Sequence, residues 1–323
     1  MNSLILKKTF LIRLFLLMTF GLNIHAYAQF GRIGDAVNKN LGKVINSKSL
    51  KLLNTEPIST KFADCDQSNI LPVDFGKDSV KQQLCNLRTD YNKITGFKLK
   101  PGFYTGTFKS FCLQAGTYGP SKGDGYLYAP LVGTKEQTAK TLIANWEEHP
   151  EIEQSHVQLL LWALLAKTNF SKLSKELQVS AALLLNDKDL RALGSSMIDF
   201  LSAEALESVT ANLPEPAKRL VALENKIRGL MYQANSSYSD VESLVMLVGA
   251  APINTQFPSG IWSYHPEGYY IKYLPNSYIS TKVEIYVPAQ LGEIHYLPVG
   301  DVAVPASTGS QRLGQSNVLV CEK

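Results

Sequence analysis

Hydrophobic positions in the middle of the chain recur at helical spacing. Leu, Ala, Lys and Glu dominate residues 135–250, and the stretch "TKEQTAKTLIANWEEHPE" (134–151) predicts a helix that ends before Pro150. The stretch after it is apolar on nearly every face from Val157 to Ala166, which indicates a helix buried in the centre of a domain. One polar residue, Gln158, interrupts this apolar run.

From Pro252 onward the hydrophobic pattern changes to alternation. The stretches "IWSYHPEGYYIKYLP" (261–275) and "KVEIYVP" (282–288) alternate aromatic or β-branched residues with polar ones, and Pro and Gly bound them, as is typical of strands. Together with the helical middle, this pattern predicts an α+β fold: a helical central domain with flanking strands and a β-rich C-terminal region.

These changes in pattern divide the chain into four expected segments. They are a signal peptide (1–28), an N-terminal segment of mixed short elements (29–103), a mainly helical domain (104–250) and the β-rich C-terminal region (251–323). The C-terminal region is rich in aromatic residues, which favours either an exposed face for a glycan or protein, or a small sheet packed on the helices. The residues concerned are Trp262, Tyr264, Tyr269, Tyr270, Tyr273 and Tyr278.

The first 28 residues have the layout of a cleaved secretory signal. Lys7, Lys8 and Arg13 lie before or within an apolar stretch that ends in "AYA" at residues 26–28. The apolar run is too short to span a bilayer core of about 30 Å, so we expect no stable membrane insertion after signal cleavage. The sequence therefore predicts an exported protein, whether extracellular, on the cell surface or periplasmic.

The charge balance excludes two classes of partner. The chain has 32 Lys and Arg residues, three of which lie in the signal, against 28 Asp and Glu residues. The mature chain is therefore near neutrality, and it has no basic cluster interleaved with aromatic residues. This excludes electrostatic binding to nucleic acid or to an anionic membrane.

Two residues are candidates for chemistry, Cys112 and Gln158. A carboxamide buried without a hydrogen-bond partner costs about 1–3 kcal/mol, so the Gln158 side chain either bonds another group inside the domain or lines a cleft. A structural hydrogen bond to the backbone is one explanation, and a functional pairing with Cys112 is the other. The residues alone leave both open.

The surroundings of these two residues resemble a known family. The stretches "FCLQ" (111–114) and "VQLLLW" (157–162), with Tyr126, Tyr128 and Pro130 between them, resemble the thioester domains of bacterial surface adhesins, also called TQxA domains. Val157 and Leu160 stand where that signature has Thr and Ala, and the interval of 46 residues between the cysteine and the glutamine is shorter than is usual in the family.

The resemblance implies a specific chemistry. In that family a cysteine and a glutamine join through an internal thioester, which here would link Cys112 to Gln158. Such a bond is a stored electrophile that an amine on a partner surface can open, so the resemblance implies single-use covalent capture of a protein or glycan surface, as in adhesion. It implies no turnover and no cofactor.

The four cysteines support a rival hypothesis. In an exported chain, Cys65, Cys85, Cys112 and Cys321 allow two disulfides in three possible connectivities. Cys65 could pair locally with Cys85, and Cys112 would then pair with Cys321. This pairing would leave no free sulfur for a thioester, and the protein would be a non-catalytic, disulfide-stabilised structural or binding protein of the cell envelope.

Other kinds of site have less support. A hydrolase that uses Cys112 would need this residue at the start of a helix, and "CLQAGTYGPSKGDG" is not a helix start. The five histidines are scattered and form no metal-binding signature. We expect His149 and His156 to be ordinary helix residues, with proton transfer near Gln158 as the alternative role.

Overall fold

The computed structural model describes residues 55–194, 210–211, 213–233 and 235–321. The predicted signal peptide lies outside these residues. The described residues belong to one compact unit.

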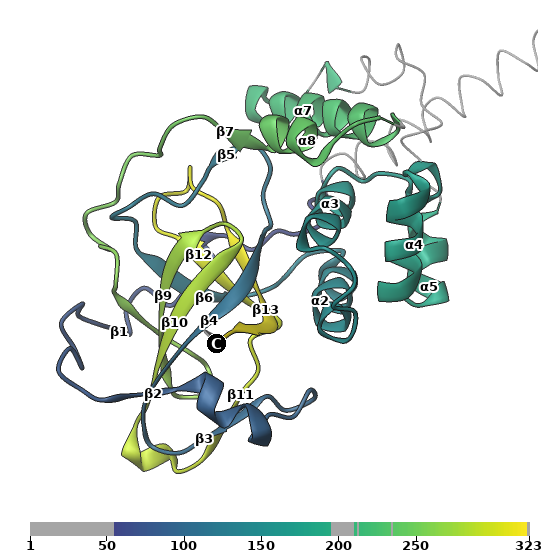
Figure 1. Ribbon diagram of the computed structural model, residues 1–323. Coiled ribbons are helices and arrows are strands. Elements are labelled where there is room, and N and C mark those ends of the chain that lie inside the picture. The colour runs from purple at the N-terminus through teal and green to yellow at the C-terminus, as the bar shows by residue number, and fades with distance from the viewer. Residues whose placement is uncertain (1–54, 195–209, 212, 234, 322–323) are drawn as a thin grey trace, which may run out of the picture. The chain divides into compact units, whose positions relative to one another are not determined.

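One large sheet organises the fold (Figure 1). Its strands follow the order β1-β8-β9-β10-β4-β13-β12-β6, with the short β2 parallel to the first part of β4. The strands are β1 (Ile70–Leu71), β2 (Lys81–Gln83), β4 (Gly102–Cys112), β6 (Tyr126–Pro130), β8 (Trp262–Tyr264), β9 (Tyr270–Ser277), β10 (Ser280–Val287), β12 (Asp301–Pro305) and β13 (Leu313–Val320). The sheet thus takes its strands from both sides of residues 135–250, the segment in which hydrophobic positions recur at helical spacing.

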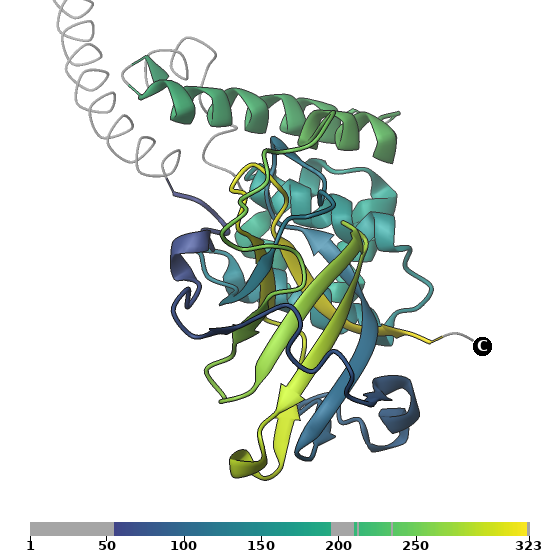
Figure 2. The same cartoon turned by 90° about the vertical axis from the view of Figure 1, so that its left-hand side faces the viewer.

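The sheet curls until its ends meet. The last strand, β6, lies beside β8 and β9, and the Tyr128 backbone N–H donates a hydrogen bond of 2.9 Å to the Ser263 hydroxyl. Figure 2 shows the long strands of this curled sheet side by side. Two short pairs complete the strands: β3 (Phe97–Leu99) with β11 (Ile294–Tyr296), and β5 (Thr117–Tyr118) with β7 (Met246–Leu247).

The helices gather on one side of the sheet (Figure 1). They are α2 (Glu136–Asn145), α3 (Gln154–Leu165), α4 (Lys175–Leu184), α5 (Asp187–Leu193), α7 (Glu215–Met231) and α8 (Tyr238–Val245). Short 3-10 turns occur at η1 (Phe62–Asp64), η2 (Leu84–Asp90), η3 (Trp146–Glu148), η4 (Phe170–Lys172) and η6 (Ala289–Leu291). The α+β prediction, with a β-rich C-terminal region, is confirmed. No helix in the described residues is long and apolar enough to cross a membrane.

Helix α3 is buried, as its apolar run predicts. Most of its residues from Val157 to Leu164 are inaccessible to solvent, and they contribute to the core that the helices form with one face of the sheet. A second core fills the inside of the curled sheet around Phe108, Tyr273 and Tyr296. The central strand β4 contributes to both cores, since Phe108 lies in the second and Cys112 in the first.

The aromatic residues of the C-terminal region divide between different environments. Tyr269 and Tyr273 lie inside the curled sheet. Trp262 packs against Phe75, with their ring centroids 6.1 Å apart. Tyr278 reaches the helices, because its hydroxyl donates a hydrogen bond to Glu242 on α8. The alternative in which all these aromatic residues form one sheet face packed on the helices is therefore wrong.

Candidate functional site

The structure brings Cys112 and Gln158 into direct contact. Cys112 is the last residue of β4 and is 0% exposed, and Gln158 lies on the inward face of α3 and is 1% exposed. The Cys112 backbone N–H donates a hydrogen bond of 2.8 Å to Gln158 Oε1, and Gln158 Nε2 donates one of 3.1 Å to the Cys112 carbonyl. The Gln158 carboxamide is therefore bonded at both polar ends to the main chain of one residue.

The sheet explains why a glutamine is needed here. The neighbouring strand β10 begins at Ser280, opposite Lys109, so the last residues of β4 extend beyond it on that side. Helix α3 covers this open edge with two glutamines one turn apart. Gln154 Nε2 donates to the Ser110 carbonyl at 3.0 Å, and Gln158 bonds Cys112 as above. Unpaired backbone groups would be costly in this buried position, and the two side chains satisfy them.

The same hydrogen bond polarises the Gln158 carbonyl. The hydrogen bond from the Cys112 N–H lies on the oxygen that would become negative if a nucleophile added to Gln158 Cδ. Serine proteases use the backbone N–H of their own nucleophile in this way, as one donor of the oxyanion hole. The residue that carries the sulfur thus also carries a donor that polarises the carbonyl.

The Cys112 sulfur is an uncharged thiol in this environment. Burial raises the pKa of Cys112 well above its usual value, and the negative charge of Glu242 raises it further. The Cys112 Sγ lies 3.8 Å from the sulfur of Met246, the first residue of β7. Because the thiolate is the nucleophile, any reaction of this sulfur needs a group that takes its proton.

Helix α8 supplies a polar network next to the thiol. The Tyr278 hydroxyl donates to Glu242, and it lies 3.1 Å from the Tyr238 hydroxyl. The ring of Tyr238 stacks on Trp162 with their centroids 5.3 Å apart, and Trp162 follows Gln158 by one helical turn. Sequence reasoning missed Tyr238 and Glu242, because nothing local to α8 indicates that it packs beside Cys112.

Three buried polar atoms around this site have no hydrogen-bond partner among the described residues. They are the Tyr126 hydroxyl, the Trp162 indole N–H and Gln311 Oε1. Burial raises the pKa of Tyr126, with further contributions from Asp124 and Cys112. Unpaired buried groups of this kind are uncommon in folded proteins, and each calls for an explanation.

The other residues of the family pattern lie apart from the thiol. Tyr128 packs against the His265 ring with their centroids 4.2 Å apart, and Pro130 ends β6. His156 contacts Ser180 at 3.2 Å and Glu176 at 3.5 Å, beside a groove of about 440 Å³. His149 pairs with its neighbour Glu151. His156 therefore connects α3 to α4, whereas His149 makes a contact close to it in the sequence.

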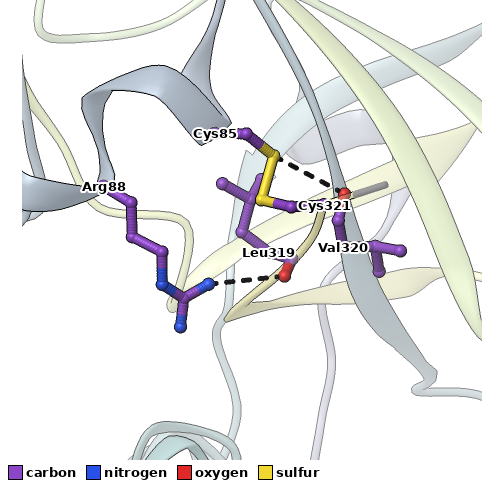
Figure 3. The surroundings of a disulfide bond; sticks show 5 residues. All are labelled: Cys85, Arg88, Leu319, Val320 and Cys321. Carbon is purple, nitrogen blue, oxygen red and sulfur yellow. Dashed lines mark hydrogen bonds between the residues drawn. A yellow bond between two sulfur atoms is a disulfide. The ribbon is translucent and has the colours of Figure 1, made fainter. Parts of the chain in front are cut away.

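The predicted disulfide pairing is wrong. All four cysteines lie in the described part of the chain, and the single disulfide joins Cys85 to Cys321 (Figure 3). The Arg88 guanidinium donates to the Leu319 carbonyl beside this bond at 3.5 Å (Figure 3). Cys65 and Cys112 are buried free thiols, and burial with Asp64 nearby raises the pKa of Cys65 to about 12.

The register of the sheet explains this correction. Strand β13 pairs with β4 so that Leu313 lies opposite Cys112 and Val320 lies opposite Thr107. The end of β13 therefore lies five residues, or roughly 16 Å, along β4 from Cys112, which is too far for a disulfide. The same pairing carries Cys321 to the 3-10 turn η2, which holds Cys85.

Within the described residues, no group of three or more His, Cys, Asp or Glu side chains is placed to hold a metal ion. No protein-family model matches the chain, and no curated protein and no solved structure matches it either. The case for any function therefore depends on the site itself.

Proposed function

We propose that this chain is an exported protein in which Cys112 and Gln158 form an internal thioester for covalent capture of amines on a partner surface. The observation that carries the proposal is the hydrogen bond of 2.8 Å from the Cys112 N–H to Gln158 Oε1, next to a sulfur that no disulfide occupies. The partner class is a protein or glycan surface, and the function is adhesion-like, without turnover.

Formation of the thioester requires one substitution at Gln158 Cδ. The Cys112 sulfur adds to this carbon, the carbon–nitrogen bond breaks, and the thiol proton leaves with the nitrogen as ammonia. The Cys112 N–H stays on the carbonyl oxygen throughout, whereas the bond from Gln158 Nε2 to the Cys112 carbonyl is lost. Glu242 is the carboxylate whose charge acts on the thiol, so it is our candidate for relaying the proton.

Capture runs this substitution in the opposite direction with a different amine. An amine adds to Gln158 Cδ, the carbon–sulfur bond breaks, and the proton from the amine returns to the Cys112 sulfur. The partner is then joined to Gln158 through an amide. Burial protects the thioester from water until that event, because both residues are almost inaccessible.

One observation favours a second candidate, a non-catalytic structural or binding protein of the cell envelope. Gln154 satisfies the β4 edge by the same kind of hydrogen bond as Gln158, and it has no cysteine to react with. In that case Gln158, like Gln154, serves only to satisfy backbone groups at the edge of β4. The disulfide from Cys85 to Cys321 stabilises the fold.

Methylamine distinguishes the two candidates. Mature protein is incubated with methylamine, digested and mapped by mass spectrometry. The thioester predicts methylamide on Gln158 in the wild type and in the matched control Cys65→Ala, and none in Cys112→Ala. An unmodified Gln158 in a folded wild type whose Cys112 alkylates as a thiol after denaturation would support the structural candidate.

A further inference from the structure

Cys112 contacts a partly exposed residue, Met246, at the end of helix α8. The Met246 sulfur lies 3.8 Å from Cys112 Sγ and 3.3 Å from Gln311 Nε2. Cys112 and Gln311 are both fully buried, whereas Met246 is partly exposed. The Met246 side chain therefore lies between these two buried groups and reaches the surface, which makes it the layer that an incoming molecule meets.

The segment that holds Met246 is short. Strand β7 comprises Met246 and Leu247, and its one partner among the described strands is β5, which is equally short. The next residue, Val248, is 99% exposed, and Gly249 follows with φ +114°. Segments held by short ladders open at lower cost in free energy than long ones, and a Met side chain changes rotamer easily.

Gln311, which also contacts Met246, offers a hydrogen-bond acceptor for an amine. Gln311 Oε1 is buried and accepts no hydrogen bond from the described residues. Because Cys112 and Gln311 contact the same Met246 sulfur, the space that this side chain fills has the thiol on one side and the Gln311 carboxamide on the other. An amine in that space could donate an N–H to Gln311 Oε1, which would remove the cost of an unpaired buried acceptor.

We propose that Met246 is the gate of the Cys112 site, and that its side chain occupies the position through which an amine reaches Gln158 Cδ. Displacement of β7 from β5 opens the gate, and Gln311 then positions the amine. The identity of the reacting amine rests on the proposed thioester, whereas the shielding of the Cys112 sulfur does not.

The test uses two probes on full-length mature protein that carries Cys65→Ala, so that Cys112 is the only free thiol. The first probe is methylamine, and its rate of incorporation at Gln158 is measured by mass. The second is N-ethylmaleimide, added to native protein after exhaustive methylamine treatment and removal of the amine. At that stage Cys112 is a thiol whether or not a thioester existed before.

We expect Met246→Ala to raise both rates by about tenfold or more, because the mutation removes the cover without the need to open the segment. Met246→Leu is the matched control and leaves both rates near those of the parent. Met246→Val shortens the side chain while suiting a strand, and it replaces the Ala variant if thermal melting shows that variant to be unfolded. Gln311→Leu lowers the methylamine rate and leaves the maleimide rate unchanged.

Equal maleimide rates in the parent and in a folded, shortened variant would overturn the gate, and so would equal, measurable methylamine rates. The outcomes for the thioester are separate. A parent that incorporates methylamine at a rate that does not depend on residue 246 retains the thioester and loses the gate. A parent that incorporates none, while its maleimide rate rises in Met246→Ala, loses the thioester and retains the gate as a cover on a buried thiol.

Discussion

Both side-chain hydrogen bonds of Gln158 are made with the main chain of one residue, Cys112. The carboxamide oxygen accepts from the Cys112 N–H at 2.8 Å and the nitrogen donates to the Cys112 carbonyl at 3.1 Å. This relationship completes the β4 edge where β10 has ended, and it also holds the Gln158 carbonyl beside the one residue whose sulfur can react with it. A structural role and a chemical role are therefore compatible at this position.

Loss of the Gln158 carboxamide should destabilise the fold more than loss of the Cys112 sulfur. Gln158→Ala leaves a buried N–H and a buried carbonyl unpaired, which should lower the free energy of unfolding by roughly 2–4 kcal/mol. Neither variant can form the thioester, so the loss of that cross-link is common to both. Cys112→Ala keeps both hydrogen bonds and should be clearly more stable than Gln158→Ala. Urea unfolding of the two variants, each compared with the wild type, measures the difference. Equal costs would show that the hydrogen bonds contribute little.

The disulfide should stabilise the fold without affecting the site. It closes a loop between residues 236 positions apart, so the paired variant Cys85→Ser with Cys321→Ser should lose about 2–5 kcal/mol of unfolding free energy. Methylamine incorporation at Gln158 should persist in this variant below its melting temperature. Loss of methylamine incorporation in a folded variant would show that the disulfide does affect the Cys112–Gln158 site.

Stability should fall at alkaline pH. Burial raises the pKa of Tyr269, Tyr273 and Tyr296 well above its usual value, with Asp301 adding to the effect. In the unfolded chain these phenols ionise near pH 10, so their contribution is complete below about pH 10 and is lost as the pH rises beyond it. Three such groups correspond to a loss of roughly 4 kcal/mol per pH unit.

Urea unfolding at a series of pH values from about 9 to about 11 tests this expectation. The Tyr296 hydroxyl has no hydrogen-bond partner among the described residues, so Tyr296→Phe can be made without loss of a bond. This variant should make the slope shallower by about 1.4 kcal/mol per pH unit, which is the contribution of one such group. A wild-type stability that stays constant over this range would contradict the burial of the phenols.

Two ion pairs should differ sharply in their contribution. Lys167 and Glu224 lie 2.9 Å apart with side chains that are almost fully buried, whereas Lys93 and Glu148 are 57% and 58% exposed. Glu224→Ala removes a carboxylate from a buried ammonium and should cost about 3–5 kcal/mol. Glu148→Ala should cost about 0–1 kcal/mol, because solvent screens that pair. Thermal or urea unfolding of both variants measures the contrast, and similar costs would contradict the burial of the first pair.

The sequence predicts local features of this protein well. The buried helix α3 is evident from its apolar run, and the alternation after Pro252 predicts the strands β9 and β10. The anomaly of one polar residue in an apolar helix is what identifies Gln158. These signals are local, because side-chain periodicity depends only on the geometry of one element.

The sequence does not predict how distant elements meet. Cys85 pairs with Cys321 because β13 lies against β4 in one register, with an irregularity between Gln315 and Leu319 that no periodicity reveals. Met246 and Glu242 reach Cys112 only because α8 packs beside α3. Gln154 could have been found, since it lies one helical turn before Gln158 on the same face.

Intact mass and thiol counting on freshly purified, denatured mature protein is the most direct test of the thioester. The account predicts a mass that is one ammonia short both before and after reduction, with a single alkylatable thiol, Cys65, before reduction. The deficit should vanish in Cys112→Ala and in Gln158→Ala. A full mass, with both Cys65 and Cys112 alkylated and only the disulfide from Cys85 to Cys321 opened by reductant, would contradict the thioester.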